Sequence, residues 1–389
     1  MPMFQDKFVF AQIVSFLNRS KFNRIVSKYD GDKYVKHFTC WNQLLAMLFG
    51  QLSNRDSLRD LINALDAHHN KCFHLGMGKN VSKSSLSRAN QDRDYHIFEE
   101  FAYYMIEQAR QKRITDIFHL EGNVYAFDST TIDLCLSVFW WAKFRKAKGG
   151  IKVHTLYDVE TQIPTFIHIT TASVHDSKVM NVIPYESGSY YIFDRAYNNF
   201  KMLYKIHQIG AYFVVRAKKN LKYKVVKWKR KLPKNVLSDA TIELIGFYPS
   251  QYYPEKFRIV RYWDEEQSRE FVFLTNAMHI SSLQVAELYK NRWQVELFFK
   301  WLKQHLKIKK FWGTTENAVR VQIYVAIITY CLVAIVQHDI KLDRSTYEVL
   351  QILSISLTDK THLKDLFSKT KIQHFKDQKD SNEPVLFNF

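Results

Sequence analysis

The stretch Val124-Tyr-Ala-Phe-Asp128 is a hydrophobic run that ends at a carboxylate, and Tyr190-Tyr-Ile-Phe-Asp194 repeats this pattern further along the chain. Runs of aromatic and β-branched residues bounded by turn formers predict short strands. Each aspartate would then lie where a buried strand meets solvent, as ligand sites on α/β sheets usually do. One such aspartate alone would more readily start a turn or cap a helix. Two in the same setting indicate a shared site.

Outward from these two runs, the chain alternates predicted strands with a helix. Asn199 to Ile209 has helical spacing, and further strand-like runs occur at 150–157, 165–169 and 211–215. This order predicts an α/β fold built on a sheet. Three other aspartates of the region lie in or after polar turn sequences, and we interpret them as structural: Asp133, Asp158 and Asp176.

The flanking regions differ from this centre. Apolar residues at three- and four-residue spacing predict helices in the first 115 residues, at Phe8–Leu17, Trp41–Leu52, Leu58–Leu65 and Phe98–Ala109. After the centre, a basic stretch leads into the strand-like runs 240–245, 257–262 and 270–274, and helical periodicity then runs from Ser282 to about Gln337. We therefore predict a helical N-terminal domain (1–118), a core in two parts (119–216 and 278–340), a β-rich insertion (217–277) and a polar C-terminal tail (341–389).

Charge and composition narrow the class of protein. Fifty-six Lys and Arg residues against 38 Asp and Glu give a net charge of +18, which favours a polyanionic partner. We find no amphipathic basic anchor for a membrane, and Val319–Val336 contains Arg320 and Gln322, so we interpret it as a buried helix. Four scattered cysteines and the lack of a signal sequence suit a protein of the reducing cytoplasm.

A third carboxylate lies in Tyr289-Lys-Asn-Arg292-Trp-Gln-Val-Glu296-Leu-Phe-Phe-Lys-Trp-Leu-Lys303. On a continuous helix, Tyr289, Arg292, Glu296 and Lys303 fall within an arc of about 60°. Buried charges are costly unless they are paired or coordinated. A structural Arg292–Glu296 pair would explain two of the four residues. A metal site built from three carboxylates, with Arg and Lys binding adjacent phosphates, would explain all four.

At this point the sequence resembles the bacterial insertion-sequence DDE transposases marked by a Tyr-x2-Arg-x3-Glu-x6-Lys motif. Tyr289, Arg292, Glu296 and Lys303 match that spacing without a gap. Phe127-Asp-Ser-Thr130 and Phe193-Asp-Arg-Ala-Tyr197 look like the two aspartate motifs of the family, although Ala196 stands where glycine is usual. The resemblance covers roughly residues 120 to 340.

The resemblance implies a ribonuclease-H-like mixed sheet with a β-rich insertion between the second aspartate and the glutamate. It implies that Asp128, Asp194 and Glu296 bind Mg²⁺, with Mn²⁺ as a substitute, and that Tyr289, Arg292 and Lys303 contact phosphates at the transposon end. In such a reaction water cleaves the phosphodiester, and the freed 3′-OH attacks a second one. Binding two ends of double-stranded DNA implies at least a homodimer.

Other features suggest further DNA contacts. Lys218–Lys234 holds nine basic residues and no acidic ones, and we predict that Lys227, Lys229, Arg230 and Lys231 contact DNA, although an exposed, solvated hairpin is the alternative. Trp293 would either stack on a displaced base or pack in the core, and we favour packing. The polar helix predicted in Val81–Asn90 is either a recognition helix or a connecting one.

Two other functions remain open. A nuclease or junction resolvase on the same core would share the three carboxylates and cut DNA without joining it. A DNA-binding regulator would carry the acidic residues incidentally. Strand transfer separates the first from a transposase, and the effect of Asp128→Asn separates the second.

Overall fold

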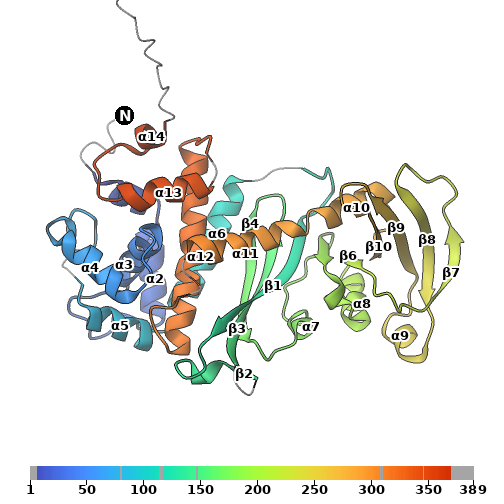
Figure 1. Ribbon diagram of the computed structural model, residues 1–389, viewed down its shortest axis with the longest axis horizontal. Coiled ribbons are helices and arrows are strands. Elements are labelled where there is room, and N and C mark those ends of the chain that lie inside the picture. The colour runs from blue at the N-terminus through green and yellow to red at the C-terminus, as the bar shows by residue number, and fades with distance from the viewer. Residues whose placement is uncertain are drawn as a thin grey trace, which may run out of the picture.

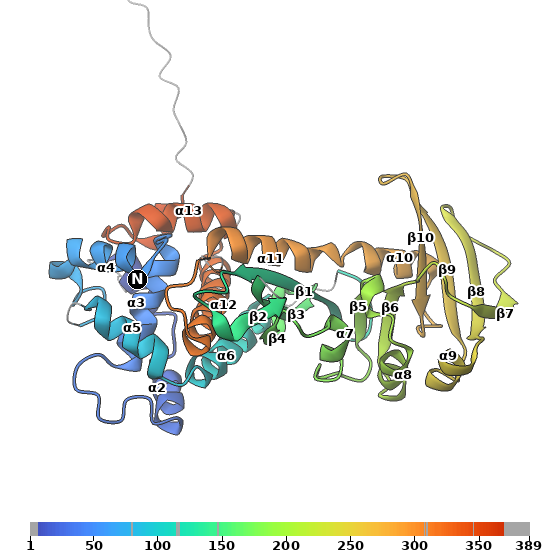
Figure 2. The same ribbon diagram turned by 60° about the horizontal axis from the view of Figure 1, so that its bottom comes forward.

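The computed structural model describes residues 7–78, 81–113, 117–145, 148–306, 308, 310–344 and 346–368. Helices gather at one end of the elongated molecule, and a twisted sheet extends to the other end (Figure 1). A long α-helical path, α10 (Ser282–Lys290) and α11 (Trp293–His305), runs along the sheet and connects the two ends (Figure 2).

The first third of the chain is helical, as predicted. Thr39, Ser57 and Ser82 each accept a backbone N–H at a helix N-terminus, which satisfies a donor that the helix itself cannot. The helices are α1 (Val9–Val14), α2 (Arg19–Lys28), α3 (Cys40–Leu52), α4 (Leu58–Ala67), α5 (Lys83–Asp92) and α6 (His96–Lys112), with a 3₁₀ turn at His69–Lys71. The sequence did not predict α2, and α1 is shorter than the run Phe8–Leu17.

The apolar run near the C-terminus is a core helix. α12 (Glu316–Asp339) packs against α6, α3 and α5 of the helical end. Of the described helices it is the one long and apolar enough to cross a membrane, yet 94% of its apolar window is buried inside the protein. The interpretation of Val319–Val336 as a buried helix is therefore confirmed.

The segment after Lys341 differs from the expected polar tail. It forms α13 (Thr346–Ser356) and α14 (Leu363–Phe367), and the backbone N–H of Val9 donates to the carbonyl of Asp359. The prediction failed because widely spaced apolar residues among polar ones bury one side of the segment: Val349, Leu350, Leu353, Leu363 and Phe367. Residues 369–389 of the predicted tail lie outside the described residues.

Ten strands form one mixed sheet in the order β2-β3-β1-β5-β6-β10-β9-β8-β7, with β4 paired to β3. β1, β5 and β6 are parallel to one another, whereas the remaining pairs are antiparallel. The strands are β1 (Val124–Leu134), β2 (Lys143–Arg145), β3 (Lys148–Asp158), β4 (Ile163–Thr171), β5 (Tyr190–Phe193), β6 (Tyr212–Arg216), β7 (Tyr223–Trp228), β8 (Val236–Leu244), β9 (Phe257–Asp264) and β10 (Arg269–Thr275). The α/β prediction is confirmed.

The β-rich stretch after β6 continues this sheet instead of forming a separate one. β10 pairs with β6 along Phe273↔Arg216 to Thr275↔Val214, so β9, β8 and β7 extend the sheet away from its centre. Short helices lie between strands along the chain: α7 (Asp176–Val179), α8 (Phe200–Gln208) and α9 (Phe247–Tyr252), with 3₁₀ turns at Trp140–Ala142 and Arg195–Tyr197. The predicted helix Asn199–Ile209 corresponds to α8.

Candidate active site

The two aspartates lie side by side at one edge of the parallel centre. β1 and β5 pair in parallel from Val124↔Tyr190 to Phe127↔Phe193, so Asp128 and Asp194 are the next residue on each strand. β5 ends there, but β1 continues to Leu134 along β3. The expectation that Asp128 ends its strand is therefore wrong, because the polar residues after it pair with β3.

The helix that carries the third carboxylate is broken. α10 ends at Lys290 and α11 begins at Trp293, and the intervening turn uses three-residue hydrogen bonds from Arg292 N–H to the Tyr289 carbonyl and from Gln294 N–H to the Asn291 carbonyl. The Asn291 side chain donates to the Glu287 carbonyl, and a side chain that bonds its own turn competes with the regular helix. The continuous helix expected over 289–303 is therefore wrong.

Arg292 joins two of the three carboxylates. Its Nη1 lies 3.2 Å from Oδ2 of Asp128, and its Nη2 lies 2.6 Å from Oε1 of Glu296. The expected four-residue pair of Arg292 and Glu296 is present, but the same guanidinium also reaches across to β1. The pair within the helix is thus part of a contact between the helix and the sheet.

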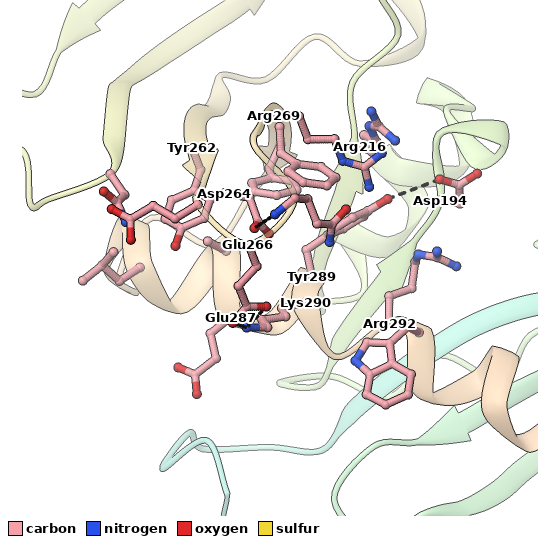
Figure 3. A pocket seen from close by; sticks show the side chains of 18 of the residues that line it. Asp194, Arg216, Tyr262, Asp264, Glu266, Arg269, Glu287, Tyr289, Lys290 and Arg292 are labelled. Carbon is pink, nitrogen blue, oxygen red and sulfur yellow. Dashed lines mark hydrogen bonds and ion pairs between the residues drawn. The ribbon is translucent and has the colours of Figure 1, made fainter.

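Tyr289 connects the remaining aspartate. Its hydroxyl donates to Oδ1 of Asp194 at 3.2 Å (Figure 3), and its buried ring packs on Phe273 of β10 at 4.7 Å between centroids. Lys303, two turns beyond Glu296, donates to the carbonyl oxygen of Thr131 on β1 at 2.9 Å. Tyr289, Arg292 and Lys303 therefore contact the sheet side of the site, and Glu296 is joined to it through Arg292.

The carboxylates affect one another electrostatically. Burial raises the pKa of Asp128 to about 6; Glu296 and Asp194 add to the rise, while the Ser129 N–H and Arg292 oppose it. Burial works to lower the pKa of Arg292, but Tyr289, Glu296 and Asp128 outweigh it and raise the value. Even with Arg292 present, the charge of Asp128 is therefore incompletely compensated.

This donor set suits a hard divalent cation chemically, because Mg²⁺ prefers carboxylate oxygens. The incompletely compensated Asp128 is a further reason to expect a cation here. Among the described residues, however, no group of three His, Cys, Asp or Glu side chains has metal-binding spacing. In the structure the guanidinium of Arg292 lies between Asp128 and Glu296 and binds both. A cation bound by both carboxylates would take the place of this guanidinium.

Two hollows open on the carboxylates. One, of about 920 Å³, is lined by Asp194, Arg292, Glu296 and, further along, by acidic residues of the β9–β10 turn. Figure 3 shows Arg216 beside Tyr289 and Asp194 in this hollow. The other, of about 440 Å³, is lined by Asp128 and Glu296 together with Lys300 and Lys303. Glu296 lines both, so the site is open to a large ligand on two sides.

Trp293 corrects a prediction. Its side chain is 48% exposed and lines the larger hollow, so it does not pack in the core. Trp293 is the first residue of α11, directly after the break, and shares the larger hollow with Phe271 and Phe273 of β10. The indole is therefore accessible from the larger hollow.

The predicted basic contacts lie elsewhere. Lys227 is on β7, the strand at the far edge of the sheet, and Lys229, Arg230 and Lys231 follow it, all of them exposed. Lys229 lies 3.8 Å from Asp239 of β8. These four residues therefore belong to a second surface, which we call the basic edge, and not to the carboxylate site.

Two further basic residues lie at the site and were not predicted from the sequence. Arg216 is the last residue of β6, the third parallel strand, and Lys300 lies one turn beyond Glu296 on α11. Arg216 could have been found by extending to β6 the reasoning applied to Asp128 and Asp194. Lys300 has four-residue spacing from Glu296, a signal present in the quoted motif.

Comparison with known proteins adds independent information. Residues 119–332 match a family model described as a transposase DDE domain, and residues 5–78 match one described as a domain of unknown function. The transposase candidate y4zB of Sinorhizobium fredii is 37% identical over 230 residues, which are 58% of this chain and 63% of that protein. The probable transposase for insertion sequence element IS5377 of Geobacillus stearothermophilus is 29% identical over 250 residues, 64% of this chain and 66% of that protein.

A third similar protein is the transposase candidate for insertion sequence element IS4SA of Synechocystis, which is 26% identical over 264 residues, 66% of this chain and 72% of that protein. The chain thus spans slightly less than two thirds of the first two relatives. The match to the DDE domain model includes Asp128, Asp194 and Glu296.

Proposed function

Because the chain belongs to the transposase DDE domain family, we propose that it is a DNA transposase, which cleaves the ends of a mobile element and joins them to target DNA with divalent metal ions. The observation that carries this proposal is the convergence of Asp128, Asp194 and Glu296, from two strands and a distant helix, on Arg292 and Tyr289. A regulator that only binds DNA has no need for such convergence.

The central strands are a ribonuclease-H-like core in this proposal. Their order β4-β3-β1-β5-β6, with β1, β5 and β6 parallel, supports it. We retain the proposed domain limits 1–118, 119–216, 217–277 and 278–340, with one addition. α12, at the end of the second part of the core, packs against the N-terminal helices, and α13 and α14, which follow it, are added to the helical domain.

Asp128, Asp194 and Glu296 would hold Mg²⁺, or Mn²⁺ in its place. Bound there, two such ions would activate the attacking oxygen and stabilise the leaving oxygen. Arg292 would exchange its carboxylate partners for a DNA phosphate, to which its planar fork is well suited. Tyr289 orients Asp194 through its hydroxyl, and Lys303, with Lys300 in the same hollow, would bind a neighbouring phosphate.

DNA would approach from the basic side of the larger hollow. Away from the carboxylates, Asp264, Glu265, Glu266 and Glu287 outnumber Arg269 and Lys290, so this part of the hollow would repel phosphates, whereas Arg216 and Arg292 lie near the carboxylates. The exposed indole of Trp293 would stack on a displaced base. Lys227, Lys229, Arg230 and Lys231 of the basic edge would bind the backbone further away. For α5, a recognition helix remains a prediction.

The chemistry has two steps at each end of the element. Water attacks the terminal phosphodiester and releases a 3′-OH, and this hydroxyl then attacks a second phosphodiester and displaces its 3′ oxygen. Since two ends are processed together, we propose a homodimer on double-stranded DNA, acting in the bacterial cytoplasm at the nucleoid.

The test is a cleavage and joining assay on DNA that carries the element's own ends. We expect cleavage and strand transfer in Mg²⁺ or Mn²⁺, and neither in EDTA. Cleavage without joining would favour a resolvase-like nuclease. If full-length protein binds the DNA but never cuts it in either metal, the enzymatic proposal is wrong and the regulator replaces it.

A further inference from the structure

A polar cluster lies on the face of β1 opposite to Asp128. Ser129 of β1 and His154 of β3 are direct partners in the sheet register, and α7 brings Asp176 against both. Lys152, two residues before His154 on β3, reaches the same carboxylate. The cluster is poorly exposed, with the side chain of Asp176 27% and that of Lys152 14% accessible.

Its contacts form a continuous chain to the candidate active site. Oδ1 of Asp176 accepts a hydrogen bond from the Ser129 hydroxyl at 2.8 Å and lies 3.1 Å from Nζ of Lys152. Lys152 also donates to the carbonyl of Val174 at 2.9 Å. The backbone N–H of Ser129 donates to Oδ1 of Asp128 at 2.8 Å. One residue therefore links a carboxylate on one face of the sheet to a carboxylate on the other.

We propose that Asp176 is a positioning residue for Asp128, which acts through Ser129. This inference rests on the proposed function, because it assumes that Asp128 binds a metal ion. Groups that hydrogen-bond to the surroundings of a metal ligand fix its orientation, and their loss typically costs about 10- to 100-fold in metal affinity or activity. Under this proposal Asp176 has a role beyond the structural one that its turn sequence predicts.

The charges of the cluster fit this role. A buried carboxylate is costly unless it is paired, and Lys152 supplies the pair while the Val174 carbonyl holds Lys152 in place. Nδ1 of His154 also faces Asp176, at 3.8 Å. With its charge balanced on its own face, Asp176 fixes the Ser129 hydroxyl without competing for the metal.

A merely structural role predicts something else. Asp176 is also the first residue of the four-residue helix α7. If it served only that turn, its loss would lower stability and leave the metal dependence of the remaining activity unchanged. Metal affinity, measured apart from activity, therefore discriminates between the two roles.

The experiment titrates the full-length protein with Mn²⁺, follows free Mn²⁺ by electron paramagnetic resonance, and records cleavage against Mg²⁺ concentration. Asp176→Ala and Ser129→Ala should each raise the Mn²⁺ dissociation constant about 10-fold or more. The double variant should be no worse than either single one, because both changes break the same link. Ser129→Thr, which keeps the hydroxyl, should restore affinity.

Asp133→Ala is the matched control, because Asp133 is exposed and lies on the same strand; it should bind Mn²⁺ as wild type does. Thermal unfolding of each variant checks the fold, and if Asp176→Ala does not fold, Ser129→Ala and Ser129→Thr alone decide. Wild-type affinity in Ser129→Ala, or multiplicative losses in the double variant, would overturn the inference alone. If wild type binds no more Mn²⁺ than Asp128→Asn, the proposed function fails with it.

Discussion

The parallel centre of the sheet and its antiparallel far edge use charge in opposite ways. At the centre, Asp128, Asp194 and Glu296 are held by specific contacts with Arg292 and Tyr289. At the edge, Lys227 of the basic edge is exposed on the last strand, and its neighbour Lys229 lies 3.8 Å from a carboxylate. The centre of the sheet holds each charged side chain in a fixed position, whereas the basic edge brings together several side chains of the same charge.

This difference follows from the work proposed for each region. Phosphoryl transfer needs oxygen ligands placed to within fractions of an ångström, so it needs buried strands that hold them. Attraction of a DNA backbone depends on the number of charges and little on their positions. Single substitutions should therefore have large effects at the centre and small, additive ones at the edge.

The strongest test of this comparison is Asp128→Asn. The amide keeps the size of the side chain but removes a charged ligand, and the loss of several kcal/mol of charge stabilisation corresponds to about 1,000-fold or more in cleavage rate. Binding of DNA to the protein should be retained, as measured by fluorescence anisotropy in metal-free buffer. Glu296→Gln should behave alike. Retained cleavage in either variant would show that the centre does not depend on fixed charges.

A second test concerns Arg292. In Arg292→Ala the half-buried Asp128 loses its guanidinium partner. We expect the free energy of unfolding without metal to fall by about 1–3 kcal/mol. The loss is smaller than for a fully buried pair because Glu296, the other partner of Arg292, is more than half exposed. Mg²⁺ should then raise the unfolding temperature of the variant more than that of wild type, since it binds where the arginine was. Cleavage should fall about 100-fold.

Arg344→Ala is a suitable comparison for Arg292→Ala, because Arg344 also pairs at four-residue spacing, with Glu348, but far from the site. Its unfolding temperature should not respond to Mg²⁺ beyond the wild-type response. Equal responses of wild type and Arg292→Ala would mean that the guanidinium and the metal do not share a place.

The sequence located the strands before Asp128 and Asp194 because the patterns that predict a strand are local. The runs before Asp128 and Asp194 are hydrophobic and bounded, and the structure pairs them in the register Phe127↔Phe193. The extension of β1 to Leu134 was not predicted, because its stability comes from pairing with β3, which is distant in the chain. Neither was the pairing of β10 with β6, which makes the insertion part of the sheet.

The helix break illustrates another limit. No proline or glycine lies between Tyr289 and Glu296, so the periodicity predicts a continuous helix, yet the side chain of Asn291 bonds to the turn and the ladder shifts. Trp293, which the sequence placed in the core, is the first residue after this break and is 48% exposed. The contact of Ser129 with Asp176 was also beyond the sequence, because it joins residues from β1 and α7 that share no motif.

A third test uses pH. Burial lowers the pKa of His154 from its ordinary value of 6.5 to about 4. Between these values the unfolded chain binds a proton that the folded protein does not, so this contribution to stability is complete above about pH 6.5 and is lost as pH falls toward 4. In urea unfolding, wild type should lose about 2 kcal/mol more than His154→Gln between pH 7.5 and 4.5. If the free energy of unfolding depends on pH identically in wild type and His154→Gln, the pKa of His154 is not lowered by burial.

The smallest effects are expected at the basic edge. Replacing Lys227, Lys229, Arg230 or Lys231 by Gln removes one phosphate contact each, so the slope of log affinity against log salt should become shallower by about 1 per charge, and cleavage of bound DNA should be unchanged. Lys364→Gln, an exposed position of α14 at the opposite end of the molecule, should leave the slope as in wild type. Because only the number of charges matters here, the losses should add up and be independent of DNA sequence. If one of the four substitutions lowers DNA affinity far more than the others, or changes the preference among DNA sequences, that side chain has a fixed position on the DNA. The basic edge would then depend on the exact positions of its charges, as the centre of the sheet does.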